Sequence, residues 1–180
     1  MSNFSYFKDR TEYKSFIFNC IEAEETVKKY PDSSIKSSRK ALELAVKWVY
    51  KNDKRLDLYK NLQKNAFPNL YTMTTDNNFK NLIGSNLSDK VDYIRKIGNS
   101  SAHTSNTIDL ERKAIHCLEN LFDFIQWIEK NYNSYNYKNK SFDVDKIPSN
   151  SEWKKYAIGA IGGALGILAL IFIGDNNKKY

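Results

Sequence analysis

The stretch that decides the fold is LERKAIHCLENLFDFIQWIEKNY, residues 110–132. Its apolar side chains recur every three or four positions, which is the spacing of one face of an α-helix. The members of this stripe are Ile115, Leu118, Leu121, Phe122, Ile125 and Ile128. The pattern predicts a long amphipathic helix that opens at Thr107 or Asp109 and buries one side in a core.

Two more helices are predicted near the N terminus by the same spacing. One apolar pattern runs between residues 9 and 30, and a second runs from about residue 34 to residue 51. Pro31 separates them, and the serines that follow it offer caps for the second helix. We therefore expect an antiparallel pair.

Shorter helices are predicted in the middle of the chain. Residues 56–67 and 77–83 each fit a short helix, the second ended by Gly84. A further helix is expected to be capped by Ser88 and to break after Ser100. Because no alternating strand pattern competes, the predicted fold class is all-α, a helical bundle over residues 1–132.

A polar face on one of these helices carries the candidate chemistry. Arg95, Asn99 and His103 stand four residues apart in YIRKIGNSSAH, residues 93–103. Residues at this spacing lie along one side of a helix. An arginine can stabilise the charge that develops on a phosphate, a histidine can move a proton, and an asparagine can orient the ligand. Such a set would suit cleavage of RNA without a metal.

The same residues fit a structural clasp equally well. In that interpretation Arg95 pairs with a carboxylate of a neighbouring helix. Glu43 is the expected partner, with Arg39 one turn earlier. Cys20 and Cys117 each stand within helix-period apolar patterns and are expected to be small core residues. We predict neither a metal site nor a cofactor, since no phosphate-binding glycine loop and no metal-ligand spacing occurs.

The C-terminal third changes character. Residues 133–155, rich in asparagine, tyrosine, lysine and serine, are predicted to be a linker. Residues 156–174 are predicted to form a transmembrane helix, because the eighteen residues 157–174 carry no charge and would span about 27 Å. Small residues four apart let helix backbones pack closely. In the predicted membrane helix the residues with this spacing are Gly159, Gly162, Gly163 and Gly166.

The charges around this segment predict its orientation. The chain has a net charge of +7, and lysines are more numerous before the segment than in the short polar tail, residues 175–180. Because positive flanks stay on the cytoplasmic side, we expect a single-pass protein of the cell membrane with its N-terminal domain in the cytoplasm.

Two motifs resemble a known family. The stretch SRKALE, residues 38–43, and the stretch IRKIGNSSAH, residues 94–103, resemble the "RxALE" and "IRxxGNxxAH" helices of a domain of unknown function. That domain also occurs at the N terminus of type I restriction endonuclease subunits and is grouped with the HEPN superfamily (higher eukaryotes and prokaryotes nucleotide-binding). The resemblance covers residues 10–132. It implies a helical bundle, dimerisation and a role in defence against invading nucleic acid.

The resemblance carries Arg95, Asn99 and His103 over as motif positions. HEPN ribonucleases generally have four to six residues between the arginine and the histidine, whereas seven stand between them here. Each added residue rotates a helical position by about 100°. Ribonuclease activity is therefore one alternative and not the main expectation.

We expect a membrane-anchored, HEPN-like effector or accessory protein of a prokaryotic defence system. The alternatives are a non-catalytic membrane adaptor or scaffold, a metal-independent ribonuclease and a pore-forming effector. The expected partners are a second copy in a homo-oligomer, the membrane, and RNA or a defence-system protein.

Overall fold

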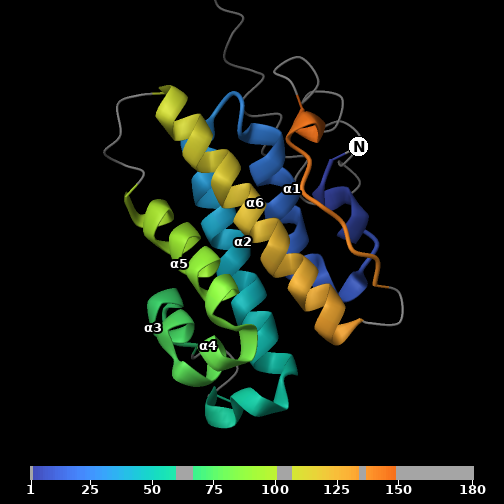
Figure 1. Ribbon diagram of the computed structural model, residues 1–180, viewed down its shortest axis with the longest axis vertical. Coiled ribbons are helices and arrows are strands. Elements are labelled where there is room, and N and C mark those ends of the chain that lie inside the picture. Colours follow the sequence, from blue (N-terminus) through green and yellow to red (C-terminus); the bar gives the residue numbers. More distant parts are fainter. Residues whose placement is uncertain (1, 60–66, 101–106, 134–136, 149–180) are drawn as a thin grey trace, which may run out of the picture. The chain divides into compact units, whose positions relative to one another are not determined.

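The computed structural model describes residues 2–59, 67–100, 107–133 and 137–148 (Figure 1). These ranges contain α-helices and short 3-10 helices and no strand. The predicted all-α class, a helical bundle, is therefore confirmed. Residues Met1–Ile147 form one compact unit.

Four long helices make the body of this unit. They are α1 (Lys14–Thr26), α2 (Pro31–Asn52), α5 (Ser85–Ser100) and α6 (Thr107–Tyr132). Helix α2 is central, since it packs against α1, α5 and α6. The short helices α3 (Leu70–Thr75) and α4 (Asn77–Ile83) lie beside α5 (Figure 1). The 3-10 helices are η1 (Phe4–Phe7), η2 (Thr11–Tyr13), η3 (Lys54–Tyr59) and η6 (Val144–Lys146).

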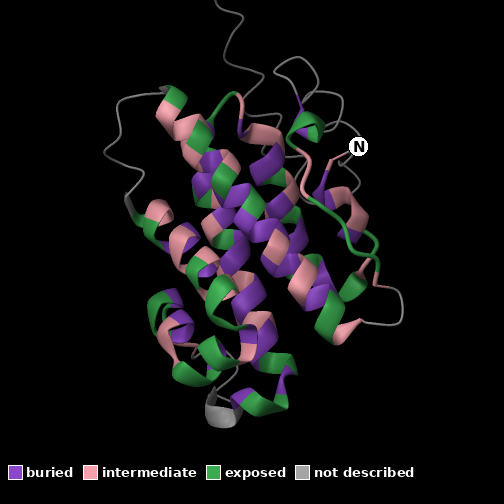
Figure 2. Cartoon of the chain, in the orientation of Figure 1, coloured by how far each residue is buried: buried purple, intermediate pink, exposed green. Residues whose placement is uncertain are grey.

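The core forms where the apolar faces of these helices meet (Figure 2). Five of the six predicted stripe residues of α6 are buried: Leu118, Leu121, Phe122, Ile125 and Ile128. Ile115 packs at the edge of the same core. Cys20 and Cys117 are free and buried, which confirms that they act as small core residues.

Two helix starts differ from the prediction. Helix α2 begins at Pro31, because the fixed φ of proline suits the first turn of a helix. Ser34 is consequently an internal, buried residue, and its hydroxyl donates to the carbonyl oxygen of Ala23 at 2.6 Å. Helix α5 begins at Ser85, so Ser88 lies inside it. The predicted end of α4 at Gly84 is confirmed, and this glycine has a φ of 81°.

Part of the predicted linker belongs to the folded unit. Residues 137–147, called the strap below, end in a buried Ile147. The side chain of Asn3 pairs with the backbone of Asp143 in both directions: its Nδ2 donates to the carbonyl oxygen and its Oδ1 accepts from the amide, each at 2.9 Å. The rings of Phe142 and Phe122 meet edge to face, with centroids 5.8 Å apart. The linker prediction missed these contacts because the strap is short and lacks periodicity.

The strap is held through a buried acid of α1. The backbone N–H and the Nδ2 of Asn3 both donate to Oε1 of Glu24, at 2.8 and 2.7 Å. Burial raises the pKa of Glu24, while the hydrogen bonds from Asn3 act in the opposite direction. One asparagine thus joins α1 to the strap.

The predicted membrane segment, residues 156–174, lies outside the described residues, as do its four glycines and the polar tail. Within the ranges that the structure describes, no helix combines the length and the apolar character needed to cross a membrane.

Candidate functional site

The two sequence motifs meet at a glycine of α5. A Cβ atom added to Gly98 would lie 2.7 Å from Cβ and 2.9 Å from Cγ of Arg39 on α2, and closer still to Cδ. Carbon atoms normally approach to about 3.5–4.0 Å. Only glycine therefore allows α5 to lie this close to α2, and Arg39 of the first motif rests directly on the second motif.

Arg95 is fixed by contacts on two sides. Its Nε donates to Oδ1 of Asp92 at 2.9 Å, and its Nη2 donates to the same oxygen. The guanidinium carbon lies 4.9 Å from the centre of the Tyr71 ring on α3, within the range of a cation–π contact. Only 9% of Arg95 is exposed. The guanidinium is thus enclosed by protein and is not open to a ligand in this arrangement.

Asp92 is held as a carboxylate at the centre of this arrangement. Burial acts to raise the pKa of Asp92, but hydrogen bonds from Lys96 and Arg95 hold that pKa below its usual value. Lys96 bonds the second carboxylate oxygen at 2.6 Å and is itself mostly exposed. One acid therefore pairs with two cations of the same helix.

The predicted pair of Arg95 with Glu43 does not form; each residue has a partner on its own helix. Glu43 accepts from Nζ of Lys47 at 2.6 Å, one turn along α2. That hydrogen bond lowers the pKa of Glu43, with smaller contributions from the charges of Lys40 and Arg39. Residues three or four apart on one helix are already neighbours, and this proximity favours the local pairs.

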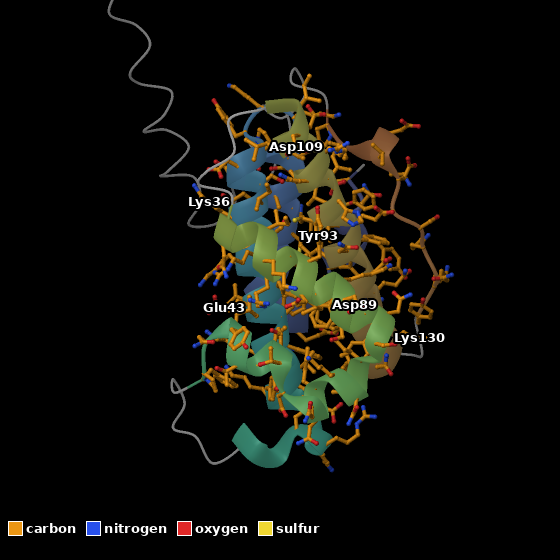
Figure 3. All side chains as sticks on the ribbon, turned by 60° about the vertical axis from the view of Figure 1, so that its left-hand side comes forward. Lys36, Glu43, Asp89, Tyr93, Asp109 and Lys130 are labelled. Carbon is orange, nitrogen blue, oxygen red and sulfur yellow. The ribbon has the colours of Figure 1, made fainter. Side chains whose placement is uncertain are left out.

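Arg39 is nevertheless part of the arrangement through its contact with Gly98. Its Nε is buried and has no hydrogen-bond partner among the described residues. Figure 3 brings α5 forward, with Glu43 on one side of this helix and Tyr93 on the other. Arg39 therefore meets the second motif by packing on a glycine, which differs from the ion pair that the clasp interpretation expected.

The predicted trio of polar residues is placed in part. Asn99 lies on α5 one turn after Arg95 and is exposed. His103 lies outside the described residues. Sequence reasoning missed Asp92 and Tyr71. Asp92 could have been found, because it stands three residues before Arg95 on one helix. Tyr71 could not, because no spacing rule links α3 to α5.

A second feature lies on the other side of α5. A hollow of about 380 Å³ opens between α5 and α6 beside the rings of Tyr93 and His116, whose centroids are 4.5 Å apart. His116 Nδ1 lies 3.3 Å from Oε2 of Glu119. The described parts of the chain contain no cluster of three metal-ligating side chains. The lining residues of the hollow do not include Arg39, Arg95 or Gly98.

Together these contacts define a helical domain with a positively charged, locally paired motif cluster made of Arg39, Asp92, Arg95 and Gly98 and covered by Tyr71. The chain belongs to the DUF4145 family, a domain of unknown function, whose model matches residues 21–148. No curated protein matches the chain, and no solved structure matches it. The matched range includes both motifs and reaches the end of the strap.

Proposed function

We propose that this chain is a membrane-anchored, HEPN-like effector or accessory protein of a prokaryotic defence system, and that it self-associates and binds RNA at the motif cluster. The membrane anchor in this proposal is the apolar segment, residues 156–174. The bundle would then act at the cytoplasmic surface of the membrane.

The observation that carries the proposal is the contact of Gly98 with Arg39. It brings the two HEPN-like motifs, which are more than fifty residues apart in sequence, into one cluster on α2 and α5. Arg95 belongs to that cluster, and Asn99 stands exposed beside it. Exposed polar and aromatic groups beside positive charge are the features that single-stranded nucleic acids commonly contact.

A second candidate is the non-catalytic adaptor, which the burial of Arg95 favours. A catalytic arginine must reach a phosphate, whereas this guanidinium is bonded to Asp92 and 9% exposed. In the adaptor, the motif contacts hold the bundle together and the bundle recruits a protein partner to the membrane.

The test is to induce three forms in bacterial cells and to follow growth, RNA integrity, membrane potential and fractionation. The forms are the full chain, the double variant Arg95→Ala/His103→Ala, and the chain ended after Asn150. We expect the full chain to stop growth and to be found in the membrane fraction. The shortened chain should be found in the soluble fraction and should leave growth unchanged. The anchored-effector proposal would be overturned if the full chain were absent from the membrane fraction. It would also be overturned if the truncated chain stopped growth as strongly as the full chain.

Further variants separate the alternatives. Asn99→Ala changes an exposed motif residue without opening the core. Asn86→Ala is its control, because it removes an exposed asparagine from the same helix outside the motif. RNA cut by the full chain and intact in the double variant would identify a ribonuclease. Depolarisation that survives the double variant and disappears on truncation would identify a pore. Absence of any phenotype would favour the adaptor.

A further inference from the structure

Tyr71 is an aromatic residue on the surface of the motif cluster. Its side chain belongs to α3, and 59% of the residue is exposed. The guanidinium of Arg95 lies 4.9 Å from the ring centre, while only 9% of Arg95 is exposed. The arginine thus supports the ring from the protein side, and the ring presents the rest of its surface to solvent.

The ring stands on a fixed support. Arg95 is held by Asp92 through Nε and Nη2. The helix that carries Tyr71 is capped by Asn69, whose Oδ1 accepts from the amide of Thr72 at 2.9 Å. On either side of the tyrosine, Leu70 and Met73 are buried in the core. An aromatic surface fixed in advance loses little conformational freedom when a ligand binds.

We propose that Tyr71 is the residue that contacts the nucleic acid, by stacking on an unpaired base, and that Arg95 is a positioning residue that acts through the ring. This inference rests on the RNA binding in the proposed function and names its substrate class, single-stranded RNA. It reverses the roles predicted from the motif, because the enclosed guanidinium of Arg95 is not free to hold a phosphate. Paired bases in a duplex have no free face for such stacking.

A matched control exists elsewhere on the surface. Tyr30 is 50% exposed, and the ammonium of Lys29 lies 4.9 Å from the centre of its ring. It therefore has the same residue type, a similar exposed fraction and the same kind of cation contact as Tyr71, but it stands at the start of α2, outside the motif cluster. Loss of binding at Tyr71 alone would thus report on the cluster and not on surface tyrosines in general.

The experiment measures the affinity of the full chain, purified in a non-ionic detergent, for a fluorescein-labelled oligouridine of twelve nucleotides. Stacking of one base accounts for about 1–3 kcal/mol, so Tyr71→Ala should weaken binding about five- to 150-fold. Tyr71→Phe should bind within about twofold of wild type, because the ring carries the contact. Tyr30→Ala should bind as wild type does, and a duplex of the same length should bind at least tenfold more weakly.

The positioning role of Arg95 has its own comparison. Arg95→Lys keeps a cation that can lie under the ring, whereas Arg95→Met removes it. If Arg95 acts through the ring, the lysine variant recovers binding that the methionine variant loses, and neither variant changes the affinity measured in a Tyr71→Ala background. Melting curves of each variant show that it is folded.

The inference is overturned if Tyr71→Ala binds oligouridine as tightly as wild type, if Tyr30→Ala loses as much affinity, or if the duplex binds equally well. A wild-type chain without affinity for oligouridine also overturns it. That last result would also overturn the RNA binding in the proposed function, whereas an unchanged Tyr71→Ala variant would overturn the role of Tyr71 alone. The membrane anchor and the effector role are judged separately, by growth and fractionation in cells.

Discussion

Gly98→Ala is the most informative single change, because it adds one carbon atom at the contact between the motifs. The new Cβ would meet the Cβ and Cγ of Arg39 at 2.7 and 2.9 Å. Both distances are well below the usual separation of non-bonded carbon atoms, about 3.5–4.0 Å. The Cβ of Arg39 is fixed to the backbone of α2, so rotation of the arginine cannot relieve the overlap and the helices must separate.

The expected loss of stability follows from two opposing effects. Overpacking of this kind costs about 1–3 kcal/mol. Replacing glycine by alanine inside a helix returns about 1 kcal/mol through helix propensity. Because the added atom would lie under 3.0 Å from three carbons of Arg39, the overpacking cost should reach about 2–3 kcal/mol. We therefore expect a net destabilisation of about 1–2 kcal/mol, which lowers the Tm of a domain of this size by about 2–8 °C.

The assay is thermal and urea unfolding followed by circular dichroism. Asn86→Ala at an exposed position of α5 outside the motifs is the control, and its stability should change by less than about 0.5 kcal/mol. Arg39→Ala should partly rescue Gly98→Ala, because it removes Cγ and Cδ but leaves Cβ. A Gly98→Ala chain as stable as wild type would show that α5 and α2 are not in close contact, and the geometry of the motif cluster would be refuted.

Three more predictions concern groups outside the motifs. Arg10→Met should destabilise the domain by about 2 kcal/mol in urea unfolding, because it leaves the fully buried carboxylate of Glu129 without its cation, while Asn133 Nδ2 still donates to it at 3.3 Å. Adding Glu129→Gln should recover part of that loss. The cost is below that of an enclosed pair, since Arg10 is 25% exposed. Burial and neighbouring acids raise the pKa of Glu25 to about 7, so the stabilisation from its neutral form is complete below pH 4.5 and lost as pH rises through 7. Glu25→Gln should therefore stabilise the domain at pH 8 and change little at pH 4 when unfolding is compared at both values. Asn3→Ala removes both hydrogen bonds between this side chain and the backbone of Asp143. The amide hydrogen of Asp143 should then exchange with solvent faster in a hydrogen-exchange measurement. An unchanged rate would mean that other contacts hold the strap.

The long helices could be predicted because their apolar residues recur with the 3.6-residue period of an α-helix. The α6 stripe is buried almost as expected, and Gly84 ends α4 as predicted. The start of α2 at Pro31 shows where local rules compete, since proline can either stop one helix or begin the next. The strap was missed because its contacts with Asn3 depend on residues 140 positions away in sequence.

The sequence indicated some members of the candidate site, but not Asp92 or Tyr71 and not the pairings. Spacing on one helix indicates which residues share a face, so Arg95 and Asn99 were placed together on α5. It does not give the distance between helices, which depends on the size of the residues at the contact. The expected partner Glu43 therefore bonds Lys47, and the ring of Tyr71 enters from α3 without a sequence signal.

The glycine and the enclosed arginine are two aspects of one packing arrangement. Gly98 stands one turn after Arg95, so the approach of α5 to α2 at Gly98 also determines how deeply Arg95 sits between the helices and α3. A larger residue at position 98 would move this part of α5 away from α2. The guanidinium would then become more exposed and its contact with Tyr71 would weaken. In this structure the motif glycine therefore contributes to stability and to the candidate binding surface through the same contact, and a change that separates the helices should affect both.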